Sequence, residues 1–289
     1  MAGIPCPYTG FTGSVAQALR AFPQYTTIWD MFQPTGYNTY QSLQVRLQKR
    51  YSNGLSFLSA YTLSKNIGVA GSDTFGDIFG GGGDHALDSY NRRIEKALAP
   101  IDRTHVLVLS WSYELPFGRG KKLGSNWNPF VSHILGGWQA NSIERYQSGT
   151  PIGIRGGPSL PLFGGGNRPN WLNSNVRSSV HMDQFDPAKD LYLNINAFGQ
   201  PAPFTLGNAP RYLPNVRTPA SYNEDFSVFK SVSFGESRSV EFRAEMFDVF
   251  NRVVFGPPAR NVNNPSTFGI ISSQANDPRV IQFGLKLLF

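Results

Sequence analysis

Apolar and polar residues alternate with a period of two along several stretches of the chain, the pattern of half-buried β-strands. The run 43–51 alternates leucine and valine with glutamine and arginine, and a second alternating run begins at Leu55. Residues 52–54 between them are Ser-Asn-Gly, a tight-turn sequence, so the two runs predict a β-hairpin. Five further runs bring the predicted strands to seven: 105–115, 138–148, 226–234, 240–246 and 280–289.

The connections between the predicted strands alternate between short and long. Tight turns at 52–54 and 235–237 and a medium link at 116–136 alternate with much longer segments. The long segments are 67–102, 149–222 and 252–279. Loops of that length are uncommon inside a compact soluble domain. Short turns on one rim and long loops on the other are typical of an outer-membrane barrel.

Charged residues share one face of the predicted strands, and large apolar residues occupy the other. In a soluble sandwich the charges face water, whereas in a membrane barrel they line a polar lumen and the apolar face meets lipid. Alternation alone fits both, but the loop asymmetry, the aromatic residues near strand ends and the last strand favour the membrane. We therefore predict an all-β, antiparallel transmembrane barrel segment with long extracellular loops. Its predicted lumen-facing residues are Arg46, Arg50, Glu241, Arg243, Glu245 and Lys286.

Composition agrees with this prediction and limits the other classes of protein. Hydrophobic residues make up 40% of the 289-residue chain, which excludes a wholly disordered protein. No apolar run approaches the roughly 18 residues of a membrane helix. The net charge of +7 is scattered, so we expect no nucleic-acid partner. A single cysteine, Cys6, excludes an internal disulfide framework and a cysteine-rich zinc site.

Catalytic and metal-binding patterns are weak. The four histidines lack metal-ligand spacing. Glu241 and Glu245 are about 13 Å apart at the rise of a strand, further than paired glycosidase carboxylates. The glycine- and aspartate-rich segment 72–88 lacks EF-hand spacing, so a solvated loop is favoured there and calcium stays an open alternative. We expect no enzymatic activity, no catalytic residue, no metal site and no cofactor.

The last predicted strand ends the chain on an aromatic residue. It resembles the C-terminal signal read by the barrel-assembly machinery of the outer membrane, which has a polar residue, a glycine two positions later, and hydrophobic residues at the third-last and last positions. Gln282, Gly284, Leu287 and Phe289 fill those places, although an aromatic residue is commoner at the position of Leu287. The alternative is an ordinary edge strand.

Several segments, in order along nearly the whole chain, resemble the C-terminal barrel of TonB-dependent outer-membrane receptors. The likeness is to the Oar-like branch, which carries carboxypeptidase-regulatory-like N-terminal domains. The matching segments are 7–25, 37–65, 102–122, 135–152, 167–170, 241–256 and 277–289. The resemblance implies a barrel of about 22 strands, a periplasmic plug domain and energy supplied through TonB.

Counting seven strands back from Phe289 places the start of the first strand on the long-loop rim. We therefore expect residues 1–36 to be an extracellular loop region, 37–289 to be the C-terminal part of the barrel, and the chain to be a fragment without plug or TonB box. The expected function is TonB-dependent uptake of an unidentified extracellular ligand across the outer membrane. The expected partners are outer-membrane lipid, the barrel-assembly machinery and, through the plug, the TonB complex. A passive barrel or surface adhesin, and a soluble all-β carbohydrate-binding module, are the alternatives.

Overall fold

One antiparallel sheet dominates the computed structural model, which describes residues 3–26, 28, 36–69, 86–88, 91–160, 167–234 and 238–289. Its long strands lie side by side in chain order, each antiparallel to the next. They are β1 (Asn38–Ser52), β2 (Leu55–Gly68), β4 (His105–Glu114), β5 (Trp138–Gln147), β8 (Ser221–Phe234), β9 (Arg238–Phe247) and β10 (Val280–Leu288). The seven predicted strands are confirmed, and the two-residue β3 (Ala97–Leu98) adds to β2.

The β1–β2 hairpin follows from its turn sequence. Ser52 pairs with Leu55, so Asn53 and Gly54 are the two central residues of the turn. Their φ angles are +54° and +79°, the left-handed backbone that a type I′ turn requires at both positions. The predicted turn at 235–237 lies outside the described residues.

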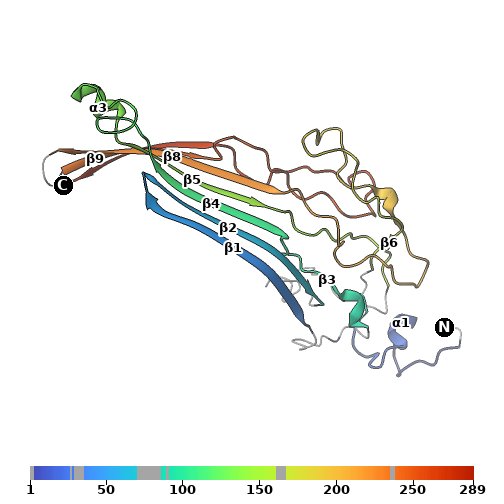
Figure 1. The fold of residues 1–289 in the computed structure, drawn as a ribbon. Helices are drawn as coiled ribbons and strands as arrows, with labels where there is room; N and C mark the ends of the chain where they lie inside the picture. The colour runs from blue at the N-terminus through green and yellow to red at the C-terminus, as the bar shows by residue number, and fades with distance from the viewer. Residues whose placement is uncertain are drawn as a thin grey trace.

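The two ends of the sheet differ, as Figure 1 shows. The short connections, the C-terminus and α3 (Pro129–Leu135) lie at one end, which we call the short-turn end. The long loops lie at the other end, with β6 (Asn170–Trp171), β7 (Phe198–Gly199), the 3₁₀ turns η1 (Arg92–Glu95) and η2 (Ile195–Ala197), and the N-terminus. Residues 3–26 lie at the long-loop end, and their extracellular position stays a prediction.

The N-terminal helix is shorter than its sequence pattern predicts. Apolar spacing predicts a helix over 14–22, but α1 covers only Val15–Ala18. Ser14 caps it, since its side chain accepts a bond from the backbone N–H of Gln17. Leu19 and Phe22 stay exposed, so packing adds little to a segment too short to be stable by itself. A possible extra strand over 26–32 lies mostly outside the described residues.

Strand register gives the sheet an apolar face and a polar face. Phe242 pairs directly with Leu285, and Ala244 with Phe283, on the apolar face. Following the pairings across the sheet, this face also carries Leu43, Val45, Tyr61, Leu107, Leu109 and Trp111. Serine, glutamine and charged residues predominate on the polar face, which also carries Leu58, Val106, Val108, Ile143 and Phe229. The sheet edges are β1 and β10, whose residues are almost all exposed.

The hydrophobic core lies in the long loops. Segments 148–160, 167–220 and 248–279, which we call the loop layer, pack against one another. Their buried cluster is Ile152, Ile154, Val176, Phe185, Tyr192, Leu193, Ala197, Phe198, Leu213, Val216, Val262, Phe268 and Ile271. Within the described residues, no helix has the length and apolar character needed to span a membrane. Because the loop layer has this buried cluster, the sheet carries a packed layer of loops at its long-loop end.

Candidate functional site

A ladder of charges runs along the polar face at β9 and β10. Arg243 donates from Nε to Glu241 Oε1 at 2.5 Å, and its Nη1 lies 3.9 Å from Glu245 Oε1. Lys286 lies directly opposite Glu241 on the neighbouring strand. The Arg243 side chain is half exposed, and ion pairs of this kind add less than about 1 kcal/mol of stability. The ladder makes this face hydrophilic while leaving its charges accessible.

The other predicted lumen residues lie on β1. Arg46 pairs with Ala60 on the polar face, and its Nη2 donates to Gln48 Oε1 at 3.1 Å. Arg50 lies in a register shift between Lys49 and Ser52. The pairings thus place Arg46 on the same face as the β9–β10 ladder. That this face lines a lumen stays a prediction.

The predicted assembly residues follow β10 to the end of the chain. Gln282 pairs with Glu245, Gly284 with Arg243, and Leu287 with Val240. A Cβ added to Gly284 would lie 3.9 Å from Arg243 Cβ, an ordinary contact, so the space around this position does not itself require glycine. Phe289 extends beyond the strand and is 99% exposed. The role of these residues in assembly stays a prediction.

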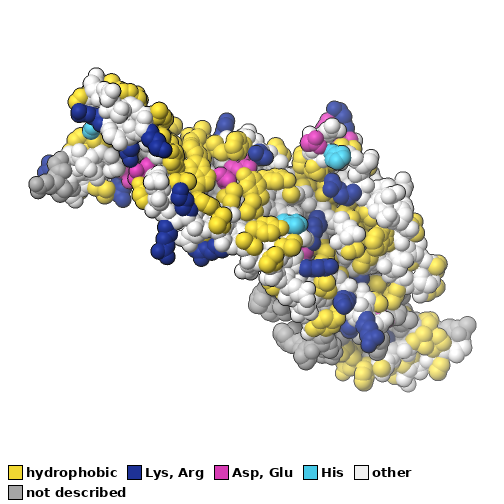
Figure 2. Space-filling view, in the orientation of Figure 1, with side chains coloured by type: hydrophobic (Ala, Val, Ile, Leu, Met, Phe, Trp, Pro, Cys, Tyr) yellow, Lys and Arg dark blue, Asp and Glu magenta, His cyan; other side chains and the backbone are white. Residues whose placement is uncertain are grey.

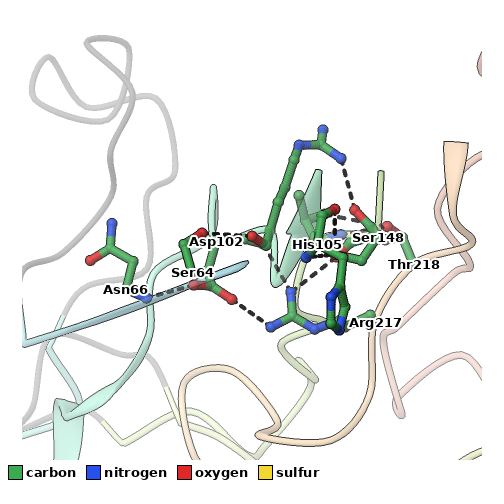
Figure 3. A network of polar contacts seen from close by, with 10 residues as sticks. Ser64, Asn66, Asp102, His105, Ser148, Arg217 and Thr218 are labelled. Carbon is green, nitrogen blue, oxygen red and sulfur yellow. Dashed lines mark hydrogen bonds and ion pairs between the residues drawn. The ribbon is translucent and has the colours of Figure 1, made fainter. Parts of the chain in front are cut away.

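A buried ion pair joins the loop layer to the strands (Figure 3). Arg217 Nη2 lies 2.5 Å from Asp102 Oδ2, and the Asp102 side chain is fully buried. The other carboxylate oxygen, Oδ1, accepts the backbone N–H of Asn66 at 2.6 Å. Arg217 Nη1 also donates to the carbonyls of Asp102 and Gly149, at 2.9 and 3.0 Å. The segments that contain Asn66, Asp102, Gly149 and Arg217 are therefore joined around this ion pair.

Further contacts in Figure 3 extend this network to β4 and the end of β5. The backbone N–H of His105 donates to Ser148 Oγ at 3.1 Å, and Arg103 Nη1 donates to the Ser148 carbonyl at 3.1 Å. Burial lowers the pKa of the Arg103 guanidinium, and the nearby charge of Arg145 lowers it further. A Cβ on Gly149 would lie 1.8 Å from the Thr218 carbonyl oxygen, so only glycine fits this crossing.

A second buried ion pair joins two loops. Arg168 Nη2 contacts Glu95 Oε2, and the Glu95 side chain is 2% exposed. Glu95 Oε1 also accepts the backbone N–H of Leu87 at 2.8 Å. Sequence reasoning missed both pairs, although Asp102 and Arg168 lie in the segments 102–122 and 167–170 that carry the family resemblance. The resemblance of these two segments was the only sign in the sequence that Asp102 and Arg168 have a structural role.

The apolar face contains two carboxylates that interrupt its pattern. Glu144 and Glu224 are paired residues on β5 and β8. Trp111 Nε1 and Ser142 Oγ donate to Glu144 Oε1 at 3.1 and 3.0 Å. Glu224 is buried with Arg252 Nε 3.4 Å from its Oε1. Figure 2 shows acidic side chains surrounded by hydrophobic ones over the strands. Glu144 is also adjacent to Arg145, so the alternation of apolar and polar residues is interrupted within 138–148.

A cavity of about 400 Å³ lies beside the Asp102–Arg217 pair. Its walls include Arg177, Tyr192, Arg217, Tyr222 and Phe255. Tyr192 donates from its hydroxyl to the Arg217 carbonyl at 2.6 Å, and Arg177 lies 4.5 Å from the centre of the Tyr192 ring. Burial raises the pKa of Tyr192. The cavity offers aromatic surface and a guanidinium group to a small polar or anionic ligand.

Metal ligands do not converge in the part of the chain that the structure describes. No group of three or more histidine, cysteine, aspartate or glutamate side chains is placed there to hold an ion. Asp73, Asp77 and Asp84, in the segment for which calcium was an alternative, lie outside the described residues.

Comparison with known proteins decides the class of this sheet. Residues 4–282 match the family described as an outer membrane beta barrel domain. The chain belongs to this outer-membrane barrel family. The family confirms an outer-membrane location and the all-β fold class, and it displaces the soluble carbohydrate-binding module as an alternative. Neither the curated proteins nor the solved structures gave a match to the chain.

Proposed function

We propose that this outer-membrane barrel chain forms part of the wall of a TonB-dependent transporter that takes up an extracellular ligand. The supporting observation is the combination of one accessible charged face along the strands with an ordered loop layer at their long-loop end. Outer-membrane barrels present such faces to a polar interior and such loops to the cell surface. The resemblance of segments 37–65, 102–122 and 277–289 to TonB-dependent receptors supports the finer assignment.

The proposed transport cycle uses three parts. The loop layer captures the ligand at the cell surface, with the 400 Å³ cavity as a candidate first contact. The charge ladder at Glu241, Arg243 and Glu245 keeps the interior wall hydrated and gives the plug polar partners. Energy supplied through TonB moves the plug, and the ligand passes along the polar face.

A passive barrel or surface adhesin is the rival function. Its supporting observation is the packing of the loop layer, which has its own hydrophobic core and is joined to its neighbours by two buried ion pairs. A fixed outer surface of this kind also serves adhesion and needs no plug.

Three strains test the proposal: the parent, a strain lacking this gene, and a strain lacking TonB. The depletion of medium components by each strain is followed by mass spectrometry. We expect at least one compound that the parent removes and both deletion strains leave in the medium. Compounds retained only by the gene-deletion strain would indicate a passive barrel. Unchanged uptake together with lost surface attachment would indicate an adhesin, and both results contradict the proposal.

A further inference from the structure

The short-turn end carries a cationic cavity that the transport function does not use. Three elements enclose about 270 Å³: the turn 117–121, the end of α3 with the residues after it, and the last part of β8. The lining includes Arg119, Lys121, His133, Lys230 and Val232. We call this structure the collar, defined as residues 117–137 with Lys230–Ser233. Lys230 pairs with Trp138 and Phe242, so the collar lies against the apolar face of the sheet.

Lys230 holds α3 against the sheet. A cation on the apolar face is costly unless it finds partners. The Nζ group of Lys230 donates to the backbone carbonyls of His133 and Ile134, the latter at 3.0 Å. These carbonyls belong to the last turn of α3, where free acceptors and the helix dipole both favour a positive charge. The lysine that interrupts the apolar pattern of β8 thus positions the helix.

The outer surface of the collar combines positive charge with apolar side chains. Arg119, Lys121 and Lys122 are exposed on the glycine-rich turn, and Lys121 binds Glu114 at 3.1 Å. On α3, the exposed apolar residues are Phe130, Ile134 and Leu135. Figure 2 shows lysine and arginine side chains beside hydrophobic ones around this helix. Aromatic and basic residues gather in this way where a protein meets lipid headgroups.

We propose that the collar binds the phosphate headgroup of an anionic phospholipid in the periplasmic leaflet of the outer membrane. Short turns face the periplasm in barrels of this class, which places the collar at that leaflet. Arg119, which lines the cavity, contacts the phosphate there, Lys122 contacts it from the adjoining exposed turn, and Phe130 and Ile134 enter the acyl region. The charge complementarity selects an anionic lipid over a zwitterionic one.

The test uses the intact outer-membrane protein, purified in detergent and titrated with phosphatidylglycerol, phosphatidylcholine or inorganic phosphate. Bound lipid is counted by native mass spectrometry. The double variant Arg119→Gln with Lys122→Gln should weaken phosphatidylglycerol binding about tenfold or more, because each basic residue near a lipid surface contributes to binding. The control variant, Arg46→Gln with Arg145→Gln, removes the same charge from the polar face and should bind as the parent does.

Both variants change exposed side chains, and heat-modifiable migration in gels confirms that each is folded. Equal binding by the parent and the Arg119/Lys122 variant would overturn the proposal. Equal affinity for phosphatidylglycerol and phosphatidylcholine would do the same. Saturation by inorganic phosphate without a preference for lipid would identify a free-anion site instead and would also overturn it.

Discussion

At the residue scale, the strands obey a simple rule that has informative exceptions. Polar side chains occupy one face and apolar side chains the other, so a charge on the apolar face needs a specific partner. Lys230 has helix carbonyls, Glu224 has Arg252, and Glu144 has Trp111. A charged residue introduced on this face at a position without such a partner should lower the stability of the folded protein.

Phe242 provides a direct test of that rule. It packs beside Phe283, with ring centres 6.3 Å apart, and pairs with Leu285. In the full-length protein, Phe242→Arg should lower the free energy of unfolding, although by less than the roughly 2–4 kcal/mol that a cation costs at the membrane midplane, because Phe242 pairs with Lys230 beside the collar. Arg243→Phe, one residue along on the polar face, is the matched control and should cost less. Urea titration in liposomes measures both, and equal losses would contradict the assignment of faces.

The buried pair at Asp102 makes a different prediction. Asp102→Ala leaves Arg217 without its carboxylate, which typically costs about 3–5 kcal/mol for a buried pair. We expect the loop layer to become sensitive to protease and to exchange its amide hydrogens faster. Asp186→Ala removes an exposed partner of Lys189 in the same layer and should cost far less stability than Asp102→Ala. Similar protease sensitivity in the two variants would argue against Asp102 as the anchor.

At the element scale, local pattern sufficed for the strands and failed for the loops. Period-two alternation and the Asn53-Gly54 turn are local signals, and they predicted the sheet correctly. The partner of Asp102 is 115 residues away, at Arg217, and no local pattern links them. The loop core likewise combines residues from Ile152 to Ile271, and their spacing follows neither the two-residue period of a strand nor the 3.6-residue period of a helix. Irregular chain crossings, such as that of Gly149 with Thr218, take the place of regular structure there.

The helix α3 was missed for a related reason. Its seven residues, Pro129–Leu135, are too few for a helical period to stand out. Its start was nonetheless visible, since Asn128 caps Val131 at 2.8 Å and Pro129 occupies the first turn. Its position depends on Lys230, which no local pattern connects to it.

The C-terminal strand tests the assembly signal. Phe289 is 99% exposed and Phe204, in the loop layer, is 90% exposed, so removing either ring costs the folded structure little contact. If Phe289 is read during assembly, deleting it should reduce the yield of heat-modifiable barrel in the outer membrane well below that of Phe204→Ala. The measurement is the folded fraction in outer-membrane preparations of the full-length protein. Matching yields would leave the proposed signal without support.

At the scale of the whole molecule, the sheet has two open edges. β1 and β10 are its outer strands, and both expose apolar residues and unpaired backbone groups. Unprotected edges promote association with other chains, and only closure removes them in a barrel. Expressed alone, this chain should therefore aggregate in detergent-free buffer, as light scattering would detect. A monodisperse monomer with a cooperative melt would contradict the account of a membrane wall.

The most direct test of the central claim is the environment of each face of β10. Nitroxide labels are placed singly at positions 281–287 of the full-length protein in outer-membrane vesicles, with Cys6→Ser as background. Collision rates with oxygen and with a water-soluble nickel chelate are then measured. We predict high oxygen access at Ile281, Phe283, Leu285 and Leu287, and high nickel access at Gln282, Gly284 and Lys286. Equal access at neighbouring positions, or the reversed alternation, would contradict a barrel wall with lipid on its apolar face and water on its polar face.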